Sequence, residues 1–109
     1  MKPPKLSIQV EPAEPLRKRV PVRDKNGKAL SDFMILFKGL HDKPQGHIQH
    51  TIKNIQKVLA GFSDVVVFAD LNLKLNLLWV SIKPVANTRH EIAGALQTIY
   101  PDARLVSHI

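Results

Sequence analysis

The sequence predicts an α+β domain whose strands and helices alternate in the order β-α-β-β-α-β. Three observations lead to this prediction. Two segments carry apolar residues at helical spacing, four short segments are rich in strand-forming residues, and turn-forming residues separate them. Because the chain has 109 residues, we expect one domain at most.

The N-terminal segment differs in composition from the rest. Residues 1–21 contain five of the eight prolines, and proline can neither donate to a sheet ladder nor sit inside a helix. We therefore expect residues 1–19 to form a disordered, basic, proline-rich arm and residues 20–109 to form the single folded domain. Asn26-Gly27 favours a turn just after the arm.

The first β-α pair follows the arm. Residues 33–39 (FMILFKG) are rich in strand formers on both faces and end at a glycine, which predicts a strand. After the loop 42–46, apolar residues recur at spacings of four, three, four and three, which predicts a helix. The apolar residues of this stripe are Ile48, Ile52, Ile55, Leu59 and Phe62. Gly61 stands where a C-terminal cap is expected.

Two strands joined by a tight reversal are expected next, over residues 63–71 and 77–83. In LNLKLNLLWV the leucines occupy alternate positions and then change side, as they do where a turn interrupts a strand. Asparagine tolerates the left-handed conformation. We therefore expect a hairpin that reverses near residues 72–76, with Lys74 at its tip and with Leu73 and Leu75 exposed there.

The second helix and the last strand complete the domain. Thr88 and Glu91 match a capping box, in which each side chain bonds a backbone N–H of the first turn. The apolar face of this helix comprises Ile92, Ala95, Leu96 and Ile99, and Pro101 ends it. Residues 103–109 are expected to form the final strand.

This element order is typical of a ferredoxin-like sandwich, a four-stranded antiparallel sheet with two helices on one face. The segments 33–39 and 77–83 are expected in the middle, because they are the most continuously apolar strands. Their apolar residues cannot all face the helices, and a large exposed apolar face usually contacts a partner. We expect a homo-oligomer or a protein partner on that face or at an edge strand, or the arm folded back over the face.

Composition excludes several classes of function. The chain has no cysteine, so disulfides, thiolate metal sites and cysteine nucleophiles are absent. No catalytic motif or paired carboxylates are recognisable, and we expect a non-enzymatic protein with no cofactor. The sequence shows neither a secretory signal nor an apolar run of membrane-spanning length, which predicts a cytoplasmic protein with no membrane contact.

Histidines are the remaining candidates for metal binding. His47 and His50 share one face of the first helix, and His41 and Asp42 lie in the loop before it. Such a set resembles the donors of zinc or nickel sites. Because this spacing is common by chance, we expect surface histidines and no metal site.

The loop GLHDKPQG (39–46) carries a pattern of aspartate, proline and glycine at Asp42, Pro44 and Gly46. It resembles the strand-to-helix turn of ACT domains, small regulatory domains with the same element order. Gln45 stands between the proline and the glycine, where the turn of that family has no residue. The resemblance implies that Asp42, Pro44 and Gly46 bind a small molecule, an amino acid in that family, at a dimer interface. A small binding or regulatory module is therefore the first function that we expect.

Nucleic-acid binding is the alternative. Residues 1–28 carry +5 of the net charge of +7, concentrated at Arg17, Lys18, Arg19 and Arg23, and a basic arm attracts phosphates. The chain also resembles RNA-recognition domains in its element order and in the strands ILFKGL and WVSI. In that family aromatic residues of the two central strands stack bases.

For this alternative, Trp79 on the third strand would have to share the open sheet face with the aromatics of the first strand. Phe33 and Phe37 lie on one face of the first strand, and Trp79 can join either face.

Overall fold

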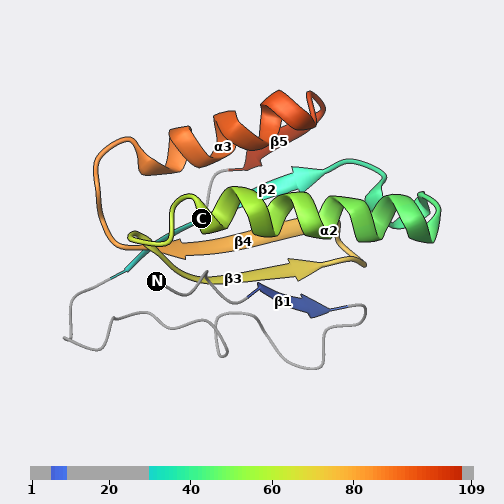
Figure 1. Cartoon of the computed structure of the whole chain (residues 1–109), viewed down its shortest axis with the longest axis horizontal. Coiled ribbons are helices and arrows are strands. Elements are labelled where there is room, and N and C mark those ends of the chain that lie inside the picture. The colour runs from blue at the N-terminus through green and yellow to red at the C-terminus, as the bar shows by residue number, and fades with distance from the viewer. Residues whose placement is uncertain (1–5, 10–29, 107–109) are drawn as a thin grey trace.

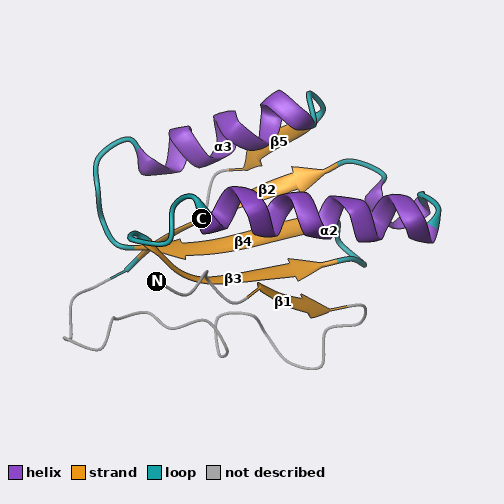
Figure 2. Cartoon of the chain, in the orientation of Figure 1, coloured by secondary structure: helices purple, strands orange, loops and turns teal. Residues whose placement is uncertain are grey.

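The structure, a computed structural model, describes residues 6–9 and 30–106 (Figure 1). The described residues form one five-stranded sheet in the order β1-β3-β4-β2-β5 and two α-helices, and Figure 2 separates these elements by colour. The strands are β1 (Leu6–Gln9), β2 (Ser31–Phe37), β3 (Val66–Asn72), β4 (Leu77–Ile82) and β5 (Ala103–Val106). The helices are α2 (Gln45–Ala60) and α3 (Thr88–Ile99), with a 3-10 turn η1 (Leu40–Asp42) before α2. The α+β class is confirmed.

The four expected strands, β2 to β5, pair in antiparallel fashion, and β2 and β4 pair with each other. A fifth strand extends the sheet: β1 pairs in parallel with β3, from Leu6 opposite Ala69 to Gln9 opposite Asn72. The prediction that residues 1–19 form a disordered arm is therefore wrong for residues 6–9. The remaining residues of that arm and residues 20–29 lie outside the described part of the chain.

The hydrophobic core lies between the sheet and the two helices, which cover the same face (Figure 1). Side chains alternate along a strand, and the alternating burial of β2 points Phe33, Ile35 and Phe37 toward the helices. The other fully buried side chains of this core come from both helices and from β3 and β4; among them are Ile55, Leu59, Leu71, Leu78, Val80, Ile92 and Leu96. The apolar stripe predicted for the first helix is thus a core-facing stripe, with Ile52 and Phe62 at its margin.

The helix ends differ from the sequence predictions. Gly61 follows α2 as its C-cap, but with φ −68° it keeps the right-handed conformation. At the start of α3 the cap residue is Asn87, with φ 66° and no side-chain hydrogen bond to the first turn. Thr88 is instead the first helical residue and is buried, so the predicted capping box with Glu91 is wrong.

The hairpin between β3 and β4 is confirmed. Asn76 takes the left-handed conformation at φ 58°, and the side-chain oxygen of Asn72 accepts a hydrogen bond from the Leu75 N–H (3.0 Å). Leu75 is 52% exposed, as expected at the tip. The expected exposure of Leu73 is wrong, because this side chain is partly buried against the core.

The sheet face opposite the helices, here called the outer face, mixes apolar and polar side chains. Strand registers place there Asp32, Met34 and Leu36 of β2, Phe68, Asp70 and Asn72 of β3, and Leu77, Trp79 and Ser81 of β4. The Trp79 Nε1–H donates to Asp32 Oδ2 (3.1 Å). Because Phe33 and Phe37 face the helices, the chain does not bring these aromatics and Trp79 onto one face. Phe33, Phe37 and Trp79 therefore do not form a shared surface on which bases could stack.

Among the described residues, no helix is both long and apolar enough to cross a bilayer.

Candidate functional site

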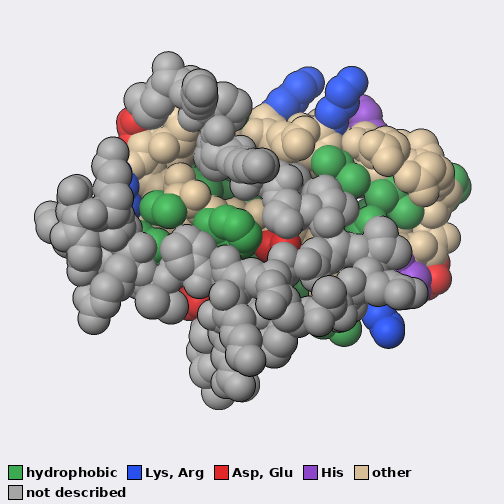
Figure 3. Space-filling view, turned by 90° about the horizontal axis from the view of Figure 1, so that it is seen from below, with side chains coloured by type: hydrophobic (Ala, Val, Ile, Leu, Met, Phe, Trp, Pro, Cys, Tyr) green, Lys and Arg blue, Asp and Glu red, His purple; other side chains and the backbone are tan. Residues whose placement is uncertain are grey.

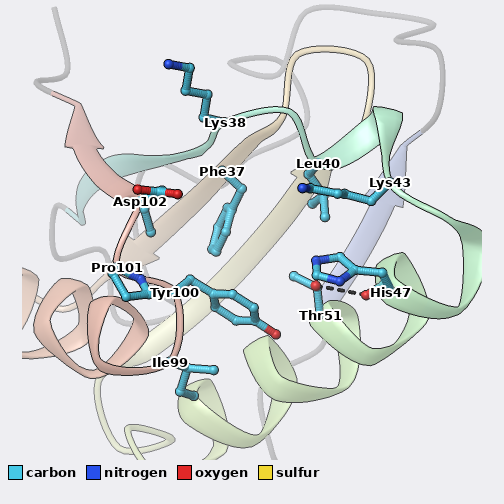
Figure 4. Close-up of a pocket in the computed structure, with 11 residues that line it drawn as sticks. Phe37, Lys38, Leu40, Lys43, His47, Thr51, Ile99, Tyr100, Pro101 and Asp102 are labelled. Carbon is cyan, nitrogen blue, oxygen red and sulfur yellow. Dashed lines mark hydrogen bonds between the residues drawn. The ribbon is translucent and has the colours of Figure 1, made fainter.

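An open cavity of about 190 Å³ lies where the end of β2, the start of α2 and the segment after α3 meet (Figure 4). A cavity of this size has room for several waters or for one small ligand. The sheet topology creates this position: β2 and β5 pair with Phe37 opposite Ala103, so the chain leaving β2 and the chain entering β5 are neighbours.

The floor of the cavity is apolar and rigidly packed. Phe37 and Leu40 are both buried, and the rings of Phe37 and Tyr100 meet edge to face with centroids 5.8 Å apart. The Tyr100 hydroxyl accepts a hydrogen bond from Asn54 Nδ2 (2.8 Å), which ties the end of α3 to α2. A floor with fixed side chains loses little conformational entropy when a ligand binds.

The rim of the cavity is charged on two opposite sides. In Figure 4 the ammonium group of Lys43 reaches over Leu40, and the Asp102 carboxylate lies on the other side of Phe37. The His47 ring lies beside Lys43, and the Thr51 hydroxyl below it donates to the His47 carbonyl (2.9 Å). The Lys38 side chain extends away from the cavity. A ligand here meets a cation on one side and a carboxylate on the other.

A second hollow adjoins the first. It is lined by Lys38, Gly39, Asp42, Lys43, Asp102 and Arg104. Lys43 and Asp102 therefore stand on the border between the two hollows and are reachable from both.

The turn that carries Lys43 is held by the β3–β4 hairpin. The side-chain oxygen of Asn76 accepts the His41 backbone N–H (2.9 Å) and lies 3.3 Å from the His41 ring Nδ1. The Asn76 carbonyl accepts the Phe37 N–H (2.8 Å). One hairpin residue thus bonds both the end of β2 and η1, which fixes the position from which the chain enters α2.

The three residues singled out by the ACT-like pattern are not brought together. Asp42 is 77% exposed and lies 3.2 Å from His41 Nε2; it lines the second hollow. Pro44 occupies the N-cap position of α2. Gly46, the second residue of α2, has no heavy atom within 4 Å of where a Cβ would stand. Their neighbours Leu40, Lys43 and His47 line the cavity instead.

The histidines do not converge. His41 pairs with Asp42 and Asn76, His47 lines the cavity, and His50 lines a groove on another side of α2. In the described ranges 6–9 and 30–106, no group of three or more histidines and acids is placed to hold a metal ion.

The residues of the nucleic-acid alternative divide into two sets. Arg17, Lys18, Arg19 and Arg23 lie outside the described residues. Trp79 lies on the outer face with Asp32 and Asp70 in the neighbouring strands. Acidic side chains beside the only tryptophan of the chain disfavour a phosphate backbone there.

Sequence reasoning missed Lys43, His47, Tyr100 and Asp102 as cavity residues. The expected sheet topology could have found them. When the last strand, β5, pairs with β2, the segment around Pro101 lies beside the loop that follows β2.

Comparisons of the chain with models of protein families, with curated proteins and with solved structures gave no match.

Proposed function

We propose that this domain is a non-catalytic binding module for a small zwitterionic metabolite, of the class of free amino acids, at the cavity between η1, α2 and the segment after α3. The observation that carries the proposal is the pair of opposite charges, Lys43 and Asp102, on two sides of an apolar floor (Figure 4). A carboxylate is attracted by an ammonium group and an ammonium by a carboxylate, so a zwitterion fits both sides at once.

The size of the cavity supports a small ligand. Pockets for drug-sized molecules measure about 300–1,000 Å³, and this cavity, at about 190 Å³, is smaller. The apolar floor of Phe37, Leu40 and Tyr100 suits an apolar side chain of the ligand. The sheet order and the two helices on one face are the basis for proposing a ferredoxin-like fold with an added edge strand, and the resemblance of residues 42–46 to ACT domains agrees with an amino-acid ligand nearby.

The alternative, nucleic-acid binding through the arm and the outer face, has less support. It relied on aromatics that share an open face, whereas Phe33 and Phe37 face the helices. It stays a prediction that a salt series of binding to generic RNA and DNA can test, because phosphate contacts weaken steeply with salt.

The proposed function is tested by thermal unfolding with each of the twenty amino acids. A ligand present at 100 times its Kd stabilises the folded state by about 2.7 kcal/mol, which raises the Tm of a domain of this size by roughly 10 °C or more. We expect one chemical group of amino acids to give this shift and the others to give none.

Substitutions of cavity residues test whether the ligand binds in this cavity. Lys43→Ala and Asp102→Asn should each weaken binding about tenfold or more, since a hydrogen bond to a charged group contributes about 1.5–3 kcal/mol. Lys57→Ala is the matched control: this lysine is also exposed, but it lies in the last turn of α2. A shift that survives in both cavity variants would place the ligand elsewhere, and no shift with any amino acid would contradict the proposed ligand class.

A further inference from the structure

The second hollow, beside the proposed amino-acid cavity, is lined by more cations than carboxylates. Lys38, Lys43 and Arg104 line it together with two carboxylates, whereas the groove on α2 has a single lysine, Lys53, in its lining. On the side of the molecule seen in Figure 3, the Lys and Arg side chains of described residues stand at the margin, and hydrophobic side chains and carboxylates also lie nearer the middle. Three cations around one hollow are therefore a local feature of the edge where β2 ends.

Strand pairing brings two of these cations together. Arg104 of β5 lies opposite Leu36 of β2, and residues directly opposite share one side of a sheet. Continuing this register past the end of β2 makes Lys38 the diagonal neighbour of Arg104. Diagonal neighbours in a sheet lie about 7–8 Å apart. Two like charges at such a distance repel each other, so an anion between them lowers the electrostatic energy.

The third cation comes from a separate segment whose position is fixed. Lys43 follows η1, and its N–H donates to the Leu40 carbonyl (3.1 Å). η1 is in turn held by the hydrogen bond from the His41 N–H to Asn76. The end of β2, the turn before α2 and the start of β5 thus each place one cation at the same hollow.

The charges of these cations are not used within the described part of the chain. Among residues 6–9 and 30–106, none of the three forms an ion pair or a side-chain hydrogen bond. Of the two carboxylates of the hollow, Asp42 lies 3.2 Å from His41 Nε2, and Asp102 borders the amino-acid cavity as well. The hollow therefore has positive charge available for an anionic ligand.

We propose that the second hollow binds a phosphate group, either free or carried by a small metabolite, through Lys38, Lys43 and Arg104. A phosphate monoester has a charge of about −1.5 to −2 at pH 7 and three strong acceptor oxygens. A guanidinium binds two phosphate oxygens in its plane, and lysines add point charges. The hollow measures about 460 Å³ and is larger than the cavity beside it, so a hydrated phosphate group fits.

Titration of the ¹⁵N-labelled full-length protein with inorganic phosphate, followed by NMR, tests this site. The ionic strength is held at about 0.15 M with sodium chloride, because charges more than about 8 Å apart are then largely screened. We expect saturable shifts of the amide signals of Lys38, Gly39 and Arg104. The amide signal of Lys53, in the groove with a single lysine, should move little.

Substitutions at the hollow should change the phosphate affinity with opposite signs. Arg104→Gln and Lys38→Gln should each weaken it about two- to fivefold, the range expected for one exposed ion pair. Asp102→Asn should strengthen it about twofold, because a repelling charge is removed, although the same variant should weaken amino-acid binding. Lys53→Gln removes an exposed lysine outside the hollow, so it is the matched control and should leave the affinity unchanged.

O-Phosphoserine and serine, used in the same titration, distinguish the two sources of the phosphate group. Equal affinities for O-phosphoserine and phosphate would support the site and assign it to free phosphate. An affinity for O-phosphoserine at least tenfold above those for phosphate and serine would support a phosphorylated amino acid that also contacts Lys43 and Asp102. This second assignment rests on the proposed function. Absence of amino-acid binding alongside saturable phosphate shifts would contradict the proposed function and support the phosphate site.

Two results would overturn the phosphate site. Shifts that grow linearly with the phosphate concentration, or that are as large at Lys53 as at Arg104, would show only the general attraction of a basic protein for anions. An unchanged phosphate affinity in both the Arg104→Gln and the Lys38→Gln variants would show that phosphate binds elsewhere.

Discussion

At the scale of the residue, Asn76 links more of the fold than any neighbour in the hairpin. Its positive φ of 58° reverses the chain between β3 and β4. Its side-chain oxygen accepts the His41 N–H, and its carbonyl accepts the Phe37 N–H. The sequence indicated the turn, because asparagine tolerates this conformation. It gave no sign that the same side chain holds η1, a contact 35 residues away.

Substitutions at Asn76 separate these two roles. Asn76→Ala should lower the free energy of unfolding by about 1–2 kcal/mol, because alanine is strained at positive φ and cannot accept the His41 N–H. Asn76→Gly removes only the side-chain acceptor and relaxes the backbone, so we expect a smaller loss. Urea unfolding followed by Trp79 fluorescence measures both. Equal stability of the alanine variant and the native protein would contradict both roles.

At the scale of the element, the helices contain glycines that their geometry does not need. Gly46 in α2 and Gly94 in α3 are exposed, and an added Cβ meets nothing within 4 Å at either position. Gly39, before η1, also has free space, but its φ of 71° is in the left-handed region. The available space is the same at all three positions, so only backbone conformation distinguishes them.

We therefore expect opposite effects of the same substitution. Gly46→Ala and Gly94→Ala should each raise the free energy of unfolding by roughly 0.5–1 kcal/mol, the propensity difference between the two residues within a helix. Gly39→Ala should lower it by about 1–2 kcal/mol. Gly46→Ala should also leave amino-acid binding unchanged, because Gly46 does not line the cavity. A loss of binding in this variant, measured by calorimetry, would indicate that the ligand binds at the ACT-like pattern of Asp42, Pro44 and Gly46 and not in the cavity.

At the scale of the whole molecule, both helices and the sheet share one core. Leu78 in β4 is fully buried in it, whereas Leu75 at the hairpin tip is 52% exposed. The two leucines are three residues apart and differ mainly in burial. The described part of the chain should therefore unfold as one unit, since no second core lies within it.

The two leucines test this single core. Leu78→Ala should cost about 2–5 kcal/mol of unfolding free energy, and Leu75→Ala should change it by less than about 0.5 kcal/mol. Far-ultraviolet circular dichroism and Trp79 fluorescence should give coincident unfolding curves. Separate transitions would mean that the sheet and the helices do not unfold together.

Much of this fold could be predicted from the sequence, because its signals are local. Residues close in sequence determine the first helix and the hairpin turn. The helix depends on the apolar stripe that includes Ile48, Ile55 and Leu59, and the turn depends on its asparagines. β1 was missed because the prolines around Leu6–Gln9 masked a strand whose partner is more than sixty residues away. The candidate site was missed for the same reason: Lys43 and Asp102 line one cavity only because β5 pairs with β2.

The pairing of β1 also has a consequence during synthesis. Leu6 leaves the ribosome before its partner Ala69, which follows 63 residues later. At about 5–20 residues per second, the first strand waits roughly 3–13 s before β3 is available. We expect β1 to join the sheet last, after the β3–β4 hairpin has formed. In a nascent chain that stalls before residue 72, β1 therefore has no complete β3 strand to pair with.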